Sequence, residues 1–413
     1  MRLLIAWRNL LAKPVQSGLT VLIVAATIAM LAVVTLLSAG THAGLIRATE
    51  PFDLIVGAKG SPNQLVLNTV FLKDVPIGNV SHEIYEKLSE NPLVASAIPL
   101  AFGDNYKGYT IVGSGSDIFF HQPKVGQGEW LQFAAGRPFS VPFEAVVGAK
   151  AAQELGLRLG DEFKSAHGFI PGGHTHDHAY RVVGILQPVN GPYDQAVLVP
   201  IESIWLAHEK HESKVEGEAI EDSHEHDHAI EDSHEHEHEV TAILVKPKGY
   251  SEAMRLYQQF QQEKGAQMIF PAQVIVQLFS ILGQGEQMLR SIAYVIIVMG
   301  LMIMTLSVYW SALGRTRDRA ILRALGASAR DIFTVILAES ALLTILGVVI
   351  GILTGHGIYL ALVKVMESKT AIVLTSGVTP EEIYIIIGGT LFGILAGLIP
   401  AVLTYKMDVA KYL

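Results

Sequence analysis

The chain has 413 residues, of which 50% are hydrophobic and 17% are charged, whereas about 25% are charged in an ordinary soluble domain. A mean hydropathy of +0.37 indicates that part of the apolar surface faces lipid. The formal net charge of −9 argues against a nucleic-acid partner, and the lack of cysteine excludes disulfides and thiolate metal sites.

Residues 1–13 predict an amphipathic helix that lies in the plane of a membrane interface. Its apolar residues share one helical face, at Leu3, Leu4, Trp7, Leu10 and Leu11. Pro14 marks the turn into a first membrane span.

Four apolar segments meet the requirement of about 20 residues for crossing a bilayer. They run approximately from Ser17 to Ala39, Leu289 to Leu313, Ile332 to Tyr359 and Ile383 to Tyr405. The first is longer than the apolar region of a signal peptide, which has about 7–15 residues, so we expect it to remain as an anchor.

Lysine and arginine gather on one side of these spans: before the first, between the second and third, and after the fourth. By the positive-inside rule, both termini and the basic loop are cytoplasmic. The chain is therefore expected to divide into residues 1–40 with the first span, an external domain at 41–287, and residues 288–413 with the remaining spans.

The external segment mixes strand-like and helical patterns. Strands are expected near residues 53–56, 109–112, 179–186 and 240–245, and helices near 83–90, 149–155 and 252–263. This pattern predicts a large α+β domain.

Histidine is concentrated in this domain, since twelve of the 16 histidines lie between His167 and His238. One group, residues 172–178, lies between two expected strands and so at a hairpin tip. A second, within a His-rich loop at 207–239, is a tandem decapeptide (219–228 and 229–238) whose copies differ only at Asp227 and Glu237. The isolated His42, His82, His121 and His356 are interpreted as ordinary polar residues.

Imidazoles that alternate with carboxylates suit a transition metal, with zinc favoured over copper and nickel. The candidate metal ligands are His174, His176, His178, His224, His226, His228, His234, His236 and His238. The alternative is a solvated, low-complexity loop, expanded by repeat slippage, that binds metal only incidentally.

Two glycine ladders mark the third and fourth spans, at Gly347, Gly351 and Gly355 and at Gly389, Gly393 and Gly397. A four-residue spacing places each ladder on one helix face and permits close helix packing. We expect the third span to pack on the fourth through these faces, with a seam between subunits as the alternative.

The basic loop before the third span predicts a short amphipathic helix. Gly326 is a natural helix stop, and Ser328 with Asp331 forms a capping-box-like start for the next helix. Glu339 is a lone carboxylate about two turns into that span; it either has a structural partner or acts directly in coupling.

The loop sequence from Arg317 to Ser328 resembles the coupling loop of MacB/FtsX/LolC-type (type VII) ABC transporter permeases. Residues 7–11 and 399–413 resemble the two ends of that family. Residues 135–139, 145–150, 157–161, 180–186 and 198–203 look like pieces of its MacB-like periplasmic core domain.

The resemblance implies a permease in the bacterial inner membrane, most simply a homodimer, with two copies of a separate cytoplasmic ABC ATPase. The residues that would contact the ATPase are Arg317, Arg319, Ile321, Leu322, Arg323, Leu325 and Gly326. The chain contains no phosphate-binding loop of the G-x-x-x-x-G-K-[ST] type and no credible catalytic constellation. We therefore expect it to be no enzyme, with ATP bound only by the partner and Zn²⁺ as the one candidate ligand of its own.

The preferred hypothesis is a mechanotransmission complex that couples ATP hydrolysis to the periplasmic domain and is linked to zinc handling. Its partners would include membrane lipid and a periplasmic metal carrier or lipoprotein. Three alternatives stay open: a signalling permease of the FtsX type that activates a periplasmic partner without transport, an exporter of drugs, peptides or lipoproteins unrelated to metal, and zinc storage or buffering by the His-rich loop alone.

Overall fold

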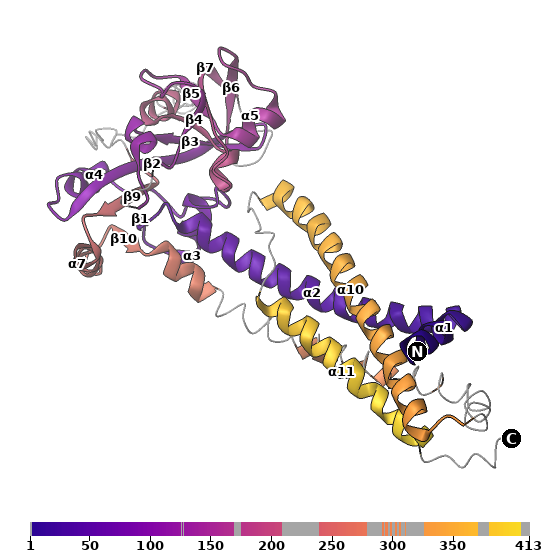
Figure 1. Ribbon diagram of the computed structural model, residues 1–413. Helices are drawn as coiled ribbons and strands as arrows, with labels where there is room; N and C mark the ends of the chain where they lie inside the picture. The colour runs from indigo at the N-terminus through magenta and orange to yellow at the C-terminus, as the bar shows by residue number, and fades with distance from the viewer. Residues whose placement is uncertain are drawn as a thin grey trace, which may run out of the picture. The chain divides into compact units, whose positions relative to one another are not determined.

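The computed structural model describes residues 2–124, 126, 128–168, 175–208, 239–278, 326–370 and 380–405, with isolated positions between 291 and 310. The chain divides into two compact units. We call them the helical unit (Met1–Ala43, Ile281–Met366 and Leu374–Leu413) and the sheet unit (Gly44–Ser280 with Glu367–Val373). Figure 1 shows the long helices of the first and the strands of the second.

The helical unit contains the expected membrane helices that fall within the described residues. Its helices are α1 (Arg2–Ala12), α2 (Pro14–Thr49), α10 (Ala329–Thr370) and α11 (Pro380–Tyr405). Three of them, α2, α10 and α11, are long and apolar enough to cross a membrane. The predicted span from Leu289 to Leu313 lies largely outside the described residues.

Helix α1 has the amphipathic character expected of an interfacial helix. Leu3, Leu4 and Leu11 are each more than 60% exposed, whereas Leu10 is buried. Asn9 on the same helix donates a hydrogen bond of 2.6 Å from Nδ2 to Oε1 of Glu339 on α10. Glu339 therefore has a structural partner within the helical unit, and this bond ties α1 to α10.

The two glycine ladders pack on different neighbours. A Cβ atom added at Gly351 would lie 2.7 Å from Cβ of Ile28, so the first ladder faces α2. On the second ladder, Gly393 and Gly397 of α11 face Thr344 and Ser340 of α10, whereas Gly389 faces Ile28 of α2. The expected packing of the third span on the fourth is therefore present through the second ladder, but the first ladder packs on α2 instead, because periodicity defines a face but not the helix that meets it.

Helix α10 begins as the sequence indicates. The backbone N–H of Ser328 donates to Oδ2 of Asp331 (3.1 Å), and the backbone N–H of Asp331 donates to Oγ of Ser328 (3.2 Å). This reciprocal pair is a capping box. Farther along α10, His356 has an acidic partner, since its Nε2 lies 3.3 Å from Oε1 of the buried Glu382 on α11. His356 is thus not an isolated polar residue.

The sheet unit is built from ten strands and short helices. The strands are β1 (Leu54–Ala58), β2 (Val94–Tyr106), β3 (Tyr109–Ser114), β4 (Phe133–Gly136), β5 (Glu144–Val147), β6 (Glu162–His167), β7 (Thr175–Leu186), β8 (Val197–Pro200), β9 (Ala242–Pro247) and β10 (Ala266–Ile269). The helices are α3 (Pro62–Thr69), α4 (His82–Ser89), α5 (Ala149–Leu155), α7 (Tyr250–Phe260), and the 3₁₀ turns η1 (Ser116–Phe120) and η2 (Pro192–Gln195). Residues 201–208 and 271–278 are also helical.

Six of the strands close into a ring. The pairings run from β2 to β3, β8, β5, β7 and β6, and from β6 back to β2. The N-terminal half of β2 pairs with β9, and the sheet continues from β9 through β1 to β10. The last link of the ring, β6 with β2, consists of the pairs Asp104↔His167 and Asn105↔Ala166.

Both faces of the sheet are buried. Neighbouring residues on one strand belong to different hydrophobic clusters, as Val146 does relative to Ala145 and Val147 on β5. Such strands read as continuous apolar runs. A polar side chain inside this sheet is therefore a feature that needs a partner.

We predict that Gly351→Ala destabilises the helical unit by about 1–3 kcal/mol, because the new methyl group overpacks the contact with α2. Gly357→Ala is the matched control, since no described atom lies within 4 Å of its Cβ position, and alanine favours a helix by up to about 1 kcal/mol. Thermal unfolding of the detergent-solubilised chain compares the two. Equal midpoints for both variants would contradict the assigned packing.

Candidate metal centre

One group of side chains in the sheet unit has the composition of a transition-metal site. Asp104, His167, His176 and His208 each offer one ligand atom, and the four atoms all lie within 4.8 Å of one another. Among the described residues this is the group of histidines and carboxylates that could hold an ion.

Four different elements bring these ligands together. Asp104 lies on β2 directly after a register shift between Phe102 and Asp104, and such bulges re-aim side chains beside functional sites. His167 ends β6 and is the cross-strand partner of Asp104. His176 lies near the start of β7, and His208 lies in the helical segment described at residues 201–208.

The three imidazoles converge on a single oxygen. Oδ1 of Asp104 lies 3.2 Å from Nε2 of His176, 3.3 Å from Nε2 of His208 and 3.6 Å from Nδ1 of His167. A zinc ion about 2.0–2.1 Å from each ligand of a tetrahedron separates the ligand atoms by about 3.3 Å. The oxygen–nitrogen distances therefore match the edges of a tetrahedral zinc site.

Burial makes the carboxylate depend on these partners. The side chain of Asp104 is fully buried and that of His176 is 6% exposed, whereas His208 and His167 are 36% and 57% exposed. A buried charge is tolerated when it is paired or binds a metal. The two exposed histidines leave the group accessible to ions from solvent.

Electrostatics in the group favours an ionised carboxylate. Burial by itself raises the pKa of Asp104, but hydrogen bonds and charge interactions with His176 and His208 outweigh it and hold this pKa below its usual range. The hydrogen bond to Asp104 in turn raises the pKa of His176 above its ordinary value, against the effect of burial. An ionised carboxylate is the form that binds a metal.

An outer layer of contacts orients the ligands. Oγ of Ser165 donates a hydrogen bond of 3.3 Å to Oδ2 of Asp104, the oxygen that does not face the histidines. On the same two strands as His167 and His176, the ring of Phe163 (β6) stacks on that of Tyr180 (β7) with centroids 5.6 Å apart. Outer partners of this kind fix ligand orientation and tune affinity.

The donor set also limits the chemistry. Three nitrogens and one oxygen suit zinc, with copper and nickel as competitors. Four protein ligands fill a tetrahedron and leave no position for an activated water. The arrangement is therefore suited to holding an ion rather than to hydrolysis.

The structure places one of the nine predicted metal-binding histidines, His176, in this group. His178 lies two residues along β7 and stacks on the ring of Phe143 at 4.6 Å. The other predicted ligands, His174, His224, His226, His228, His234, His236 and His238, lie outside the described residues.

Sequence reasoning missed the other three ligands. His167 and His208 belong to the histidine-rich stretch but stand alone, without the alternation that marked the predicted ligands. Asp104 follows an apolar run that ends in Phe102 and Gly103, and a Gly-Asp pair after such a run indicates a turn rather than the interior of a strand. A carboxylate inside a strand that is otherwise buried was the available signal.

The predicted ATPase-contacting residues Arg317, Arg319, Ile321, Leu322, Arg323 and Leu325 also lie outside the described residues. Gly326 is described, and its φ of +100° is in the left-handed region. Such a backbone is typical of the glycine that ends a helix.

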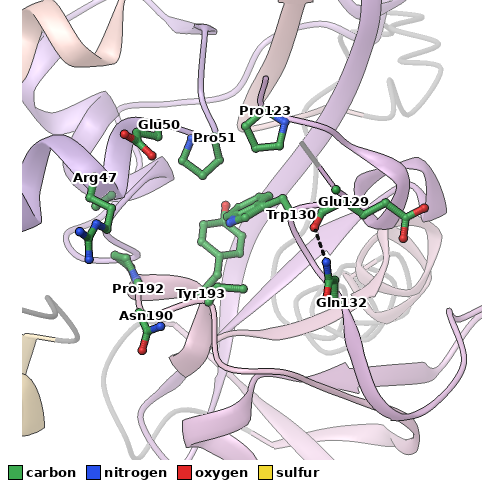
Figure 2. A pocket seen from close by; sticks show the side chains of 14 residues that line it. Arg47, Glu50, Pro51, Pro123, Glu129, Trp130, Gln132, Asn190, Pro192 and Tyr193 are labelled. Atoms are coloured by element: carbon green, nitrogen blue, oxygen red, sulfur yellow. Dashed lines mark hydrogen bonds between the residues drawn. The ribbon is translucent and has the colours of Figure 1, made fainter. Parts of the chain in front are cut away.

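A cavity of about 300 Å³ is the second candidate site of the sheet unit (Figure 2). Trp130 and Tyr193 form its aromatic wall, with ring centroids 4.7 Å apart. Arg47 and Glu50 add one charge of each sign to the lining. This volume is at the small end for ligand cavities, and the lining singles out no class of ligand, so the metal centre is the better-defined site.

Two family models match successive parts of the chain. Residues 17–255 match the family model described as a MacB-like periplasmic core domain, and residues 290–409 match the FtsX-like permease C-terminal model. The comparison with curated proteins gives no match.

Two solved structures are similar to part of the chain. The periplasmic region of MacB from Actinobacillus actinomycetemcomitans has 10% identity and a TM-score of 0.33, with 56% of this chain and 94% of that one covered. The extracellular domain of the noncanonic ABC-type transporter YknZ from Gram-positive bacteria has 14% identity and a TM-score of 0.29, with 52% and 98% covered.

We predict that folding stability depends on pH in opposite ways in the metal-free and the zinc-bound chain. Without metal, the Asp104–His176 pair stabilises the fold fully below the ordinary histidine pKa of 6.5, and this is lost as pH rises through the raised pKa of His176. At the acid end it is lost as pH falls through the lowered pKa of Asp104. With zinc, stability rises over the neutral range because binding needs neutral imidazoles.

Thermal unfolding at about pH 6 and about pH 8, with chelator or with zinc, measures both slopes. The midpoint should fall with pH in chelator and rise with pH in zinc. The same slope in both conditions would contradict the assignment of these four residues as ligands.

Proposed function

Because the chain belongs to the MacB/FtsX-type family of ABC transporter permeases, we propose that it is the inner-membrane subunit of a mechanotransmission complex whose periplasmic domain binds zinc. In this family the ATPase is a separate partner subunit. The sheet unit corresponds to the MacB-like periplasmic domain. The group Asp104, His167, His176 and His208 is the observation that carries the zinc link.

Rigid helices support mechanotransmission. Helix α10 starts at its capping box, directly after the proposed coupling loop, and continues for 42 residues, or about 63 Å at 1.5 Å per residue. Helix α2 has 36 residues, or about 54 Å. Both exceed the hydrocarbon thickness of about 30 Å, so movement at the cytoplasmic ends would be transmitted beyond the membrane.

The cytoplasmic ends of the helical unit are linked to one another. The hydrogen bond from Asn9 to Glu339 joins α1 to α10, and close glycine contacts join α10 to α2 and α11. A force applied to the coupling loop would therefore move these helices as a group. The distribution of Lys and Arg supports a topology with both termini in the cytoplasm, and a homodimer with two ATPase copies is the simplest assembly.

The zinc link rests on geometry within the described fold rather than on the histidine repeats. The four ligands come from strands and a helix outside the decapeptides. The repeats at residues 219–238 then act as an additional, weaker reservoir of imidazole. A zinc-linked permease has one tight zinc site that remains when the repeats are removed, whereas a permease with unrelated cargo has none.

We predict that the full-length chain in nanodiscs binds one zinc ion tightly, and that Asp104→Asn and His208→Ala each weaken this binding by at least about 10–100-fold. A chain lacking residues 219–238 should keep the tight site and lose only weak binding. His178→Ala is the matched control, because His178 lies beside the group but is not part of it. Competition with a chromophoric zinc chelator measures affinity and stoichiometry.

If tight zinc binding is lost when the decapeptides are removed but persists in Asp104→Asn, the repeats bind the zinc and the four-residue group does not. No tight binding in any form would leave an ABC permease of other cargo or a signalling permease.

We also predict that Arg323→Ala and Leu325→Ala lower ATP hydrolysis by the co-purified ATPase by roughly 10-fold, since the coupling contact is lost, while zinc affinity is unchanged. The effect corresponds to about 1.4 kcal/mol of coupling. Lys411→Ala, another cytoplasmic cation, serves as the control. If Arg323→Ala and Leu325→Ala hydrolyse ATP as fast as the Lys411→Ala control, the loop does not have the proposed coupling role.

A further inference from the structure

The metal centre lies at one of the two shortest links of the strand ring, since β2–β6 and β5–β8 are each paired through two residue pairs. The β2–β6 pairing that closes the ring contains two residue pairs. By contrast, β2 pairs with β3 and with β9 through six residue pairs each. Opening at β2–β6 would therefore break few ladder hydrogen bonds.

Other contacts also cross this seam, and the rings of Tyr106 on β2 and Phe163 on β6 lie 4.7 Å apart between centroids. The backbone N–H of Gly168 donates to the carbonyl oxygen of Gly103 at 2.7 Å, and Nδ2 of Asn105 donates to the carbonyl oxygen of Gly168 at 2.7 Å. Both bonds are between neutral groups, whose net contribution to stability is small. The charged contacts across the seam all involve the candidate ligands.

A bound ion would cross the seam. Asp104 lies on β2, on one side, whereas His167 and His176 lie on the β6–β7 hairpin, on the other. His208, from the helix at residues 201–208, supplies the fourth bond. One ion would thus link positions 104 and 208, and such a cross-link restricts the opened chain much as a disulfide does.

We propose that zinc at this centre is a resident ion that closes the strand ring, so that the concentration of free zinc outside the membrane sets whether the β6–β7 hairpin is fastened to β2. This rests on the proposed function only in requiring that the ion binds. Zinc is then a ligand that the complex senses rather than the cargo that it moves.

The ligand set supports a resident ion. Two of the four ligands, Asp104 and His176, are buried within the sheet, so an ion held by them is poorly placed to be released in each ATPase cycle. The exposure of His167 and His208, at 57% and 36%, still lets the site equilibrate with solvent. Slow equilibration with reversible occupancy is what a sensor requires and a transport site does not.

Hydrogen–deuterium exchange of the full-length chain in nanodiscs tests this inference. With free zinc at about 100 times its Kd, exchange through opening of the seam should slow by about 100-fold relative to chelator. The protected amides should lie in residues 103–106 and 163–168. Amides of β1 and β10, on the far edge of the sheet, serve as the internal control and should not change.

Variants separate the inference from the proposed function. Asp104→Asn and His208→Ala should exchange at the seam as fast with zinc as the parent does in chelator, and His178→Ala should behave as the parent. Because chelator and zinc are compared first on the unmutated chain, the result does not depend on the folding of any variant.

Zinc that binds with one-to-one stoichiometry but leaves exchange at the seam unchanged would overturn the resident-ion proposal and leave the zinc site standing. Absence of binding in the chelator competition would overturn both.

Discussion

The burial of one carboxylate constrains the sheet unit more than any other feature. Asp104 is fully buried in a sheet whose two faces are covered mainly by apolar side chains. An isolated ionised carboxylate in such a place is very costly. Three imidazoles and the hydroxyl of Ser165 offset that cost, and each must be held by its own strand or helix. The closure of the ring at β2–β6 and the helix at residues 201–208 both serve this arrangement.

Much of the architecture follows from local pattern. Helices α4, α5 and α7 and strands β1, β3, β7 and β9 lie where periodicity predicts them, because amphipathic spacing and β-branched runs report burial directly. The capping box at Ser328 and Asp331 was equally legible, since its partners are three residues apart. Structural features that depend on residues close together in the chain can be predicted from sequence.

Features that depend on register are not recovered. His176 was found because it belongs to an alternating histidine run, but its partner Asp104 is 72 positions away. Only the pairing of β2 with β6 brings His167 beside Asp104. The glycine ladders show the same limit: Gly351 was correctly read as a packing face, yet its neighbour is α2 rather than the following helix. Which faces meet is decided by tertiary packing.

The most direct measurement is X-ray absorption at the zinc edge on the full-length chain lacking residues 219–238 and loaded with one equivalent of zinc. The account predicts four nitrogen or oxygen ligands at about 2.0–2.1 Å, with the multiple scattering of three imidazole rings. One ring should disappear from the spectrum of His208→Ala. Six oxygen ligands, or a spectrum that the substitution leaves unchanged, would contradict the metal centre on which the account rests.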